Sequence, residues 1–172
     1  MTVTLEKYFG KIWKPNIDQY HYSGWRVLSL IKETDQVLDV GCGYNLFKSA
    51  LGNRLTGIDP YNDAADHKVS IEDWHYDYQY DVVLCLGSIN FGSEETILKQ
   101  LDKIATVTKT GGKVIWRQNP GRKDHNNKEC QDIDFFDWSF QKNLDYAKRF
   151  GFEVDIIAWD NGKRIYAEWT KL

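Results

Sequence analysis

Short apolar runs alternate with longer segments of helical spacing along most of this chain. The runs at 36–40, 54–58 and 80–87 have little polar content, which is typical of parallel strands buried on both faces. Between residues 94 and 108 apolar residues recur every three or four positions, which predicts an amphipathic helix with Ser93 as its N-cap. This alternation predicts an α/β domain built on a mainly parallel sheet.

The C-terminal part has the pattern of a helix followed by a hairpin. Residues 139–150 predict a helix that Gly151 ends, and Asp160-Asn161-Gly162-Lys163 then joins two β-rich runs. An Asn-Gly pair between such runs is a strong hairpin signal. Residues 45–51 predict a helix after the first strand. The expected strands are 36–40, 54–58, 68–71, 80–87, 113–117, 152–159 and 164–170.

Length and composition predict one globular domain. The chain has 172 residues, and we expect a single domain over 1–172, with a helical or lid-like segment at 1–33 before a core at 35–172. Residues 25–32 predict a helix in that first segment, which is rich in aromatic side chains. These aromatics either complete the core or wall a pocket: Tyr8, Phe9, Trp13, Tyr20, Tyr22 and Trp25.

Charge and cysteine content narrow the function classes. A net charge of −3 disfavours a broad electrostatic grip on nucleic acid. No apolar run approaches the roughly 20 residues that span a bilayer, and the N-terminus lacks signal-peptide features. We therefore expect a cytoplasmic protein with no membrane partner and with three buried, reduced thiols, Cys42, Cys85 and Cys130, none spaced for a metal.

The most informative stretch is Val37-Leu38-Asp39-Val40-Gly41-Cys42-Gly43-Tyr44-Asn45. An apolar run that ends in a glycine-rich turn allows a ligand to approach the main chain closely. The next predicted strand ends in Asp59, and a carboxylate there is placed to hold ribose hydroxyls. Together these features predict a nucleoside-bearing cofactor across two strand ends.

The glycine pattern also discriminates between cofactors. A pyrophosphate is typically held by G-x-G-x-x-G, but Leu46 stands at the third glycine position. The Asp39 carboxylate, two residues before Gly41, would repel a pyrophosphate and would suit a cationic ligand. A nicotinamide-dependent oxidoreductase is therefore disfavoured.

The D-x-G-x-G pattern after a hydrophobic strand resembles the first motif of class I S-adenosylmethionine (SAM)-dependent methyltransferases. Asn45 stands where that motif commonly has a third glycine, and asparagine tolerates left-handed backbone well. The resemblance covers about residues 35–172. It implies a Rossmann-like sheet of seven strands in the order 3-2-1-4-5-7-6, closed by the antiparallel hairpin and covered by helices on both faces.

The resemblance also implies roles for individual residues. The methionine part of SAM would lie against the turn, where backbone N–H groups of residues 41–45 meet its carboxylate and Asp39 meets its ammonium group. The remaining cofactor contacts implied are the ribose acid Asp59, the nucleoside neighbours Pro60 and Tyr61, the adenine partners Asp73 and Trp74, the turn residues Gly41, Cys42, Gly43 and Asn45, and Leu86 and Gly87 beneath the sulfonium.

Residues after the fourth strand are candidates for contact with the methyl acceptor. Ser88, Asn90 and Phe91 follow that strand, and Arg117 ends the fifth. In-line methyl transfer relies mainly on alignment and needs a base only for some acceptors, so we assign no catalytic residue. His125, Arg122 and Lys123 lie in the long polar segment 119–137 and are weaker candidates for a base and for anion contacts.

Three functions remain open from the sequence. The leading one is methyl transfer to a small molecule or a protein side chain. A catalytically inactive SAM-binding scaffold would carry the same cofactor residues. A nucleic-acid methyltransferase is disfavoured, because Ser88-Ile89-Asn90-Phe91 lacks the Pro-Pro of the enzymes that methylate base nitrogens. The oligomeric state is not indicated by the sequence.

Overall fold

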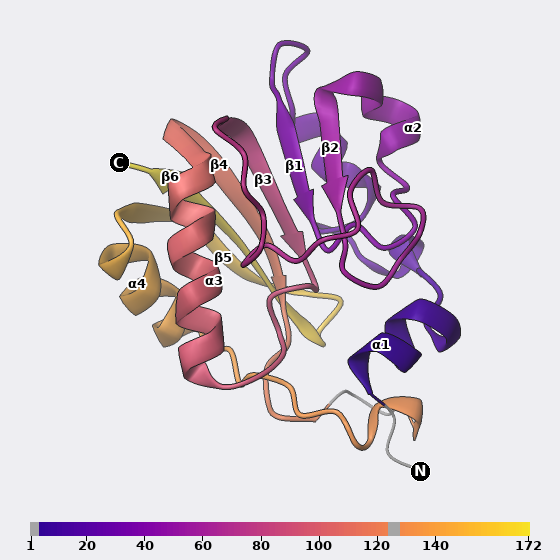
Figure 1. Cartoon of the computed structure of the whole chain (residues 1–172). Helices are drawn as coiled ribbons and strands as arrows, with labels where there is room; N and C mark the ends of the chain where they lie inside the picture. The colour runs from indigo at the N-terminus through magenta and orange to yellow at the C-terminus, as the bar shows by residue number, and fades with distance from the viewer. Residues whose placement is uncertain (1–3, 124–127) are drawn as a thin grey trace.

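A computed structural model describes residues 4–123 and 128–172 (Figure 1). Its centre is a six-stranded sheet in the order β2-β1-β3-β4-β6-β5. The strands are β1 (Val37–Val40), β2 (Leu55–Ile58), β3 (Tyr80–Leu86), β4 (Thr108–Gln118), β5 (Phe152–Asp160) and β6 (Arg164–Lys171).

The strand directions bring several chain ends to one edge of the sheet. Strands β2, β1, β3 and β4 pair in parallel, and β6 pairs antiparallel with both β4 and β5. The turn between β5 and β6 therefore lies at the same edge as the carboxyl ends of the parallel strands. In parallel sheets this edge is where ligands bind.

Helices and short turns cover both faces of the sheet, as the sequence predicts. Helices α3 and α4 pack on one face, over a core that includes Trp116, Trp138 and Trp169 (Figure 1). The other face is covered by η3 and α2, around Val27, Leu51 and Leu84. The helical elements are α1 (Leu5–Lys7), η1 (Tyr8–Ile12), η2 (Ile17–Gln19), η3 (Trp25–Leu30), α2 (Lys48–Leu51), η4 (Gly52–Arg54), α3 (Glu94–Val107), η5 (Lys128–Cys130) and α4 (Phe140–Arg149).

The prediction of a seventh strand at 68–71 is wrong. His67 makes a single parallel bridge to Ile58, and the chain then turns at 70–73, where the Ser70 hydroxyl bonds the Asp73 carboxylate. Ile71 and Trp74 are both buried, and their spacing of three is that of a turn rather than a strand. Without this strand, the expected order reduces to the observed one.

Two of the expected helices are shorter than the sequence suggests. The helix expected at 45–51 is only α2, because Asn45 has φ 56° and cannot begin a right-handed helix. The segment 25–32 forms the 3₁₀ turns of η3. Helix α3 begins after Ser93, whose hydroxyl accepts from the Thr96 N–H as expected of an N-cap, and none of the helices among the described residues could cross a bilayer.

One buried carboxylate fastens the N-terminal segment to the far end of the sheet. Asp160, at the end of β5, is fully buried and accepts hydrogen bonds from the backbone N–H groups of His21, Tyr22 and Ser23 at 2.8, 3.1 and 2.8 Å. The Ser23 hydroxyl adds a fourth at 2.6 Å. Burial would raise the pKa of Asp160, but these hydrogen bonds outweigh it and hold the pKa below its ordinary value.

Asp160→Asn should destabilise the protein by about 2–4 kcal/mol at neutral pH, because an amide cannot accept all of these hydrogen bonds. Since the folded pKa is depressed, this contribution is complete above the unfolded pKa and is lost as the pH falls through the folded value. The difference between wild type and variant should therefore narrow below about pH 4. Urea unfolding at pH 7 and pH 3.5 measures both quantities.

Asp102→Asn is the matched control, because Asp102 is an exposed carboxylate on α3. Its unfolding free energy should stay within about 0.5 kcal/mol of wild type. Equal stability of the Asp160 and Asp102 variants at pH 7 would contradict the anchoring role of Asp160.

Candidate functional site

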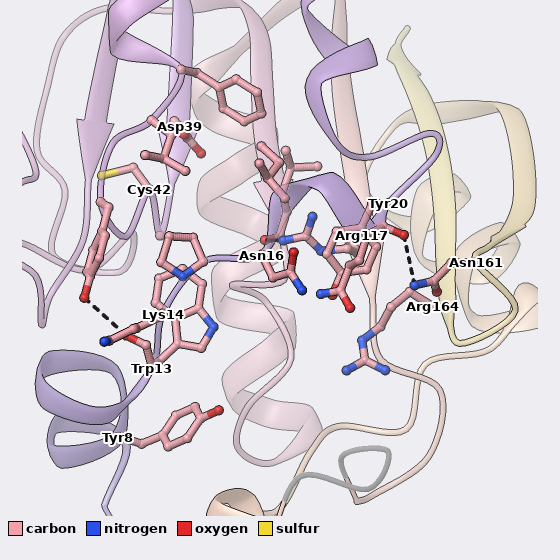
Figure 2. A pocket seen from close by; sticks show the side chains of 18 of the residues that line it. Tyr8, Trp13, Lys14, Asn16, Tyr20, Asp39, Cys42, Arg117, Asn161 and Arg164 are labelled. Atoms are coloured by element: carbon pink, nitrogen blue, oxygen red, sulfur yellow. Dashed lines mark hydrogen bonds between the residues drawn. The ribbon is translucent and has the colours of Figure 1, made fainter.

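Two adjoining clefts open at the carboxyl edge of the sheet. The main cleft has a volume of about 500 Å³ and the side cleft about 160 Å³. Gly41, Leu86 and Arg117 line both, so the two form one continuous hollow at the ends of β1, β3 and β4. Figure 2 shows the N-terminal segment, with Trp13 and Tyr20, facing these strand ends across it. The volume of the main cleft is in the range typical of small-molecule sites.

The glycine turn after β1 has the backbone conformation that its sequence predicts. Gly41, Gly43 and Asn45 have φ of 70°, 54° and 56°, in the left-handed region. A Cβ on Gly41 would lie 2.3 Å from the Cβ of Ser88, and one on Gly43 would lie 2.7 Å from the Trp13 ring. Glycine is therefore required at both positions, because the chain after β3 and the N-terminal segment each approach the turn closely.

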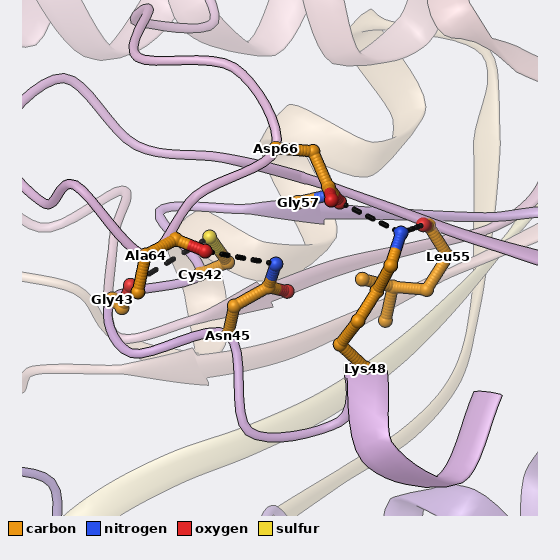
Figure 3. Close-up of polar contacts among 8 residues, drawn as sticks. All are labelled: Cys42, Gly43, Asn45, Lys48, Leu55, Gly57, Ala64 and Asp66. Atoms are coloured by element: carbon orange, nitrogen blue, oxygen red, sulfur yellow. Dashed lines mark hydrogen bonds and ion pairs between the residues drawn. The ribbon is translucent and has the colours of Figure 1, made fainter. Parts of the chain in front are cut away.

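Polar contacts fix the turn to the segment that follows β2 (Figure 3). The Asn45 amide donates to the Ala64 carbonyl at 3.2 Å. Lys48 donates to the Leu55 carbonyl at 2.6 Å and pairs with Asp66 at 3.0 Å. The Asp66 carboxylate also accepts from the Gly57 N–H at 2.8 Å. Asn45 thus serves the architecture of the turn, and it does not line either cleft.

Asp59 joins the glycine turn to the end of β2. One of its carboxylate oxygens accepts from the Gly43 N–H at 2.9 Å, and the other accepts from Tyr61 and Asn62 at 2.8 and 3.0 Å. The side chain is buried but lines the side cleft together with Pro60 and Tyr61. A carboxylate has about four lone-pair sites, so Asp59 retains acceptor capacity toward the cleft.

Most backbone N–H groups of the turn already have partners. Those of Gly41 and Cys42 donate to the Ile58 carbonyl, and that of Asn45 donates to Cys42. The Gly43 N–H is taken by Asp59. This differs from the expectation that these groups receive a carboxylate. A negatively charged group near the turn must therefore find its partner elsewhere.

Asp39 and Arg117 are opposite charges on neighbouring parts of the cleft. Asp39 is buried in β1, and among the described residues no group hydrogen-bonds its carboxylate. Burial raises the pKa of Asp39 from its ordinary value of 3.8 to about 7; the Arg117 charge lowers it and the Asp59 charge raises it. Asp39 is therefore a carboxylate that gains from a cationic ligand.

Arg117 is held in place by neutral groups. Its guanidinium donates to the Ser23 and Leu86 carbonyls at 3.0 and 2.8 Å and lies 4.0 Å from the centre of the Tyr20 ring. Burial lowers the pKa of Arg117, although the group stays protonated. Arg122 and Lys123, proposed with it from the sequence, line neither cleft.

Cys42 lines the main cleft but is a poor nucleophile. Burial raises the pKa of its thiol, and the charges of Asp39 and Asp59 raise it further. The thiol therefore stays protonated at neutral pH, and the thiolate is the reactive form. All three cysteines are free; Cys85 and Cys130 are buried as predicted, whereas Cys42 is only partly buried.

The acceptor-side candidates gather in the side cleft. Ser88, Asn90 and Phe91 line it along with Gly87, and the buried Ser88 hydroxyl has no hydrogen-bond partner among the described residues. Asn119, which the sequence pattern does not indicate, lies beside them, and its backbone N–H donates to the Asn90 amide oxygen at 3.0 Å. These groups offer neutral hydrogen bonding to a ligand.

Asp73 and Trp74 are not brought to the clefts. Asp73 is exposed and bonded to Ser70, while Trp74 is buried against His67 and Tyr76. Neither lines the main or the side cleft. His125 lies outside the described residues.

The hairpin and the N-terminal segment supply walls that the sequence motif does not reveal. Asn161, Lys163 and Arg164 line the main cleft, because the turn between β5 and β6 falls at the strand-end edge. The hairpin signal, taken together with the implied strand order, could have predicted that this turn lies beside the cleft. From the N-terminal aromatics, Tyr8, Phe9, Trp13 and Tyr20 line the clefts, whereas Tyr22 and Trp25 do not.

An aromatic cluster closes the side cleft. Phe9 contacts Phe91 with ring centroids 5.2 Å apart, and Phe91 contacts Phe135 at 5.1 Å. Tyr8 and Cys130 pack into the same cluster. Two segments distant in sequence, 5–13 and 130–135, thus meet over the ends of the strands. No group of three or more metal-ligating side chains is found in the described parts of the chain.

The unusual ionisation of Asp39 can be measured directly. We expect its carboxyl carbon to titrate near pH 7 by NMR in the ligand-free protein. Arg117→Gln should raise this pKa, because it removes the charge that favours the carboxylate, and Asp59→Asn should lower it. Because the folded pKa is raised, unfolding free energy should fall as the pH rises from about 4 to 7, and Asp39→Asn should remove that slope.

A titration of Asp39 near its ordinary value would contradict the burial of the carboxylate.

Comparisons with known proteins show the fold of this chain. No protein-family model and no curated protein sequence matches it. Among solved structures, magnesium protoporphyrin IX methyltransferase from Synechocystis, determined with bound SAM, is similar with a TM-score of 0.67 and 13% identity, covering 98% of this chain and 95% of that one.

Two further solved structures have the same fold. A putative SAM-dependent methyltransferase from Listeria monocytogenes is similar with a TM-score of 0.64 and 13% identity, over 86% of this chain and 95% of its own. The 1,6-didemethyltoxoflavin-N1-methyltransferase from Burkholderia thailandensis, determined with bound 1,6-didemethyltoxoflavin and S-adenosylhomocysteine, is similar with a TM-score of 0.64 and 14% identity. The similarity covers 80% of this chain and 71% of that one. The chain therefore has the Rossmann-like fold of SAM-dependent methyltransferases, with six strands instead of seven.

Proposed function

We propose that this protein is a SAM-dependent methyltransferase that acts on a small molecule. The observation that carries the proposal is the meeting of the glycine turn, Asp39 and Asp59 around one hollow at the carboxyl edge of the sheet. The solved structures with this fold that contain SAM or S-adenosylhomocysteine support it.

The donor set fits the parts of SAM. Asp39 is a carboxylate without a hydrogen-bond partner in the described part of the chain and suits the cofactor's ammonium group, and Asp59 retains acceptor sites for ribose hydroxyls. Pro60 and Tyr61 would border the nucleoside, and Leu86 and Gly87 would lie under the sulfur. Gly41 and Gly43 allow the close approach that a larger residue would block. Asn45 would act indirectly, by holding the turn.

Methyl transfer from SAM depends more on alignment of the reactants than on acid or base catalysis. SAM supplies an activated methyl group on a sulfonium. The chain's own residues exclude water with the aromatic cluster and orient the acceptor with Ser88, Asn90 and Phe91. The protonated thiol of Cys42 does not take part as a nucleophile.

A nicotinamide dinucleotide fits this turn poorly. Helix α2 has four residues and begins at Lys48, so no long helix points its N-terminus at a phosphate. The Gly43 N–H, which a pyrophosphate would need, is held by Asp59. The adjacent Asp39 carboxylate adds repulsion.

The neighbours' substrates support a small-molecule acceptor. Two of the three named structures are methyltransferases named for small molecules, magnesium protoporphyrin IX and 1,6-didemethyltoxoflavin. Residues of the N-terminal segment line both clefts, so a long protein or nucleic-acid substrate would have to fit beside this segment to reach the strand ends. We therefore favour a small molecule over a protein side chain or a nucleic acid.

Calorimetry tests the cofactor. SAM and S-adenosylhomocysteine should bind, and NAD should bind much more weakly or not at all. A preference for NAD would overturn the proposal. Methyl transfer from labelled SAM to a panel of small aromatic acceptors then separates an enzyme from an inactive scaffold, because both bind SAM but only the enzyme releases S-adenosylhomocysteine.

The affinity for SAM should rise with pH between about 5.5 and 7.5, because Asp39 must lose its proton to meet the ammonium group. Asp39→Asn should weaken binding by about 1–2 kcal/mol at pH 7.5 and flatten this pH dependence. Calorimetry at several pH values measures both effects.

Asp73→Asn is the control for this series. It removes an acid that lies outside both clefts, so its affinity and pH profile should match wild type. If Asp39→Asn keeps the wild-type profile, Asp39 shapes the turn without contacting the cofactor.

A further inference from the structure

The main cleft carries more positive charge than its proposed cofactor requires. Among the residues that the structure describes, two carboxylates line it, Asp39 and Glu129. The cations that line it are Lys14, Arg117, Lys163 and Arg164. Since the whole chain has a net charge of −3, this excess of cations is local to the cleft. A local excess of one sign attracts ligands of the other.

Arg117 is the innermost of these cations. Its hydrogen-bond partners are the carbonyls of Ser23 and Leu86, and no carboxylate of a described residue lies within ion-pair distance. A buried guanidinium without a charged partner is costly. A guanidinium has five N–H donors, and these two hydrogen bonds use two of them. A planar guanidinium that lines a cleft and keeps further donors is well suited to a carboxylate.

The other cations reach the cleft from separate elements. Lys14 comes from the N-terminal segment, while Lys163 and Arg164 come from the hairpin between β5 and β6. Figure 2 shows Lys14, Arg117 and Arg164 placed around the same hollow. Lys14 and Lys163 are exposed at the rim, so they can guide an anion inward toward Arg117.

Aromatic rings form the remaining walls. Tyr8, Trp13 and Tyr44 line the main cleft, and Tyr20 lies over the Arg117 guanidinium. Trp13 and Tyr44 also contact each other edge to face, with ring centroids 5.9 Å apart. A flat ring that carries a negative group satisfies both the walls and the cations.

We propose that the methyl acceptor is a small aromatic carboxylate, which Arg117 binds where the main cleft and the side cleft join. Ser88, Asn90 and Phe91 would then border the acceptor from the side cleft, while Lys14 and Lys163 line the main cleft toward solvent. This inference rests on the proposed function and names its substrate class. The carboxylate of the cofactor is a second source of the same chemistry. It is a single group, however, and the cations are spread over three separate parts of the chain.

Benzoate and benzamide are matched probes, because they share a ring and differ in charge. Binding is followed by intrinsic tryptophan fluorescence, with and without saturating S-adenosylhomocysteine, at low and high salt. Benzoate should bind about tenfold more tightly than benzamide at low salt, and the difference should shrink as salt rises.

Arg117→Gln should abolish the preference for benzoate, and Lys163→Gln should reduce it about two- to threefold. Lys148→Gln, which removes an exposed lysine on α4 away from both clefts, is the matched control and should leave it unchanged. Since Lys163 is exposed in a turn, its variant remains informative if the Arg117 variant fails to fold.

A second titration tests whether Arg117 binds the carboxylate of the acceptor or that of the cofactor. S-adenosylhomocysteine and 5′-methylthioadenosine differ by the amino-acid group, so a cofactor role for Arg117 would make Arg117→Gln weaken the first and not the second. That result, with an unchanged preference for benzoate, overturns the inference. So does equal binding of benzoate and benzamide to wild type. Failure of S-adenosylhomocysteine to bind overturns the proposed function instead, and the benzoate comparison without it still decides whether the cleft selects anions.

Discussion

The shape of the cleft depends on the hydrogen bonds that the carboxylate of Asp160 accepts at the end of β5. Asp160 accepts hydrogen bonds from the backbone N–H groups of residues 21–23. These bonds hold the N-terminal segment across the strand ends. The Ser23 carbonyl, fixed in this way, then accepts from Arg117. One buried interaction therefore sets both the wall of the cleft and the position of the cation inside it.

The glycine turn is a second constraint, and it is local. Ser88 from the neighbouring strand end and Trp13 from the N-terminal segment approach the turn so closely that a Cβ on Gly41 or Gly43 would overlap them. Asp59 then ties the turn to the end of β2 through Gly43. Because backbone groups inside the turn are largely satisfied, ligand selectivity passes to the side chains around it, above all Asp39 and Arg117.

The sequence predicts best what depends on local pattern. The glycine turn, Asp59, the helix after Ser93 and the Asn-Gly hairpin are all governed by neighbouring residues. The prediction of a strand at 68–71 is wrong because Ile71 and Trp74 are buried from within a turn. A short apolar stretch alone does not distinguish a buried turn from a buried strand. The hairpin residues Lys163 and Arg164 reach the cleft through strand order, which no local pattern encodes.

The ionisation of the cleft bears on whether it has kept a function. Within residues 4–123 and 128–172, the buried Asp39 carboxylate has no hydrogen-bond partner and the Arg117 guanidinium has no carboxylate partner. Both groups cost folding free energy, and they line the same hollow. Asn at position 39 or Gln at position 117 would carry no such charge. A scaffold that needs only the fold has no physical reason to keep both. Groups that destabilise the empty protein and gain from oppositely charged ligands are characteristic of binding sites. The charges of Asp39 and Arg117 therefore favour a cleft that still takes a cationic group beside Asp39 and an anionic group beside Arg117.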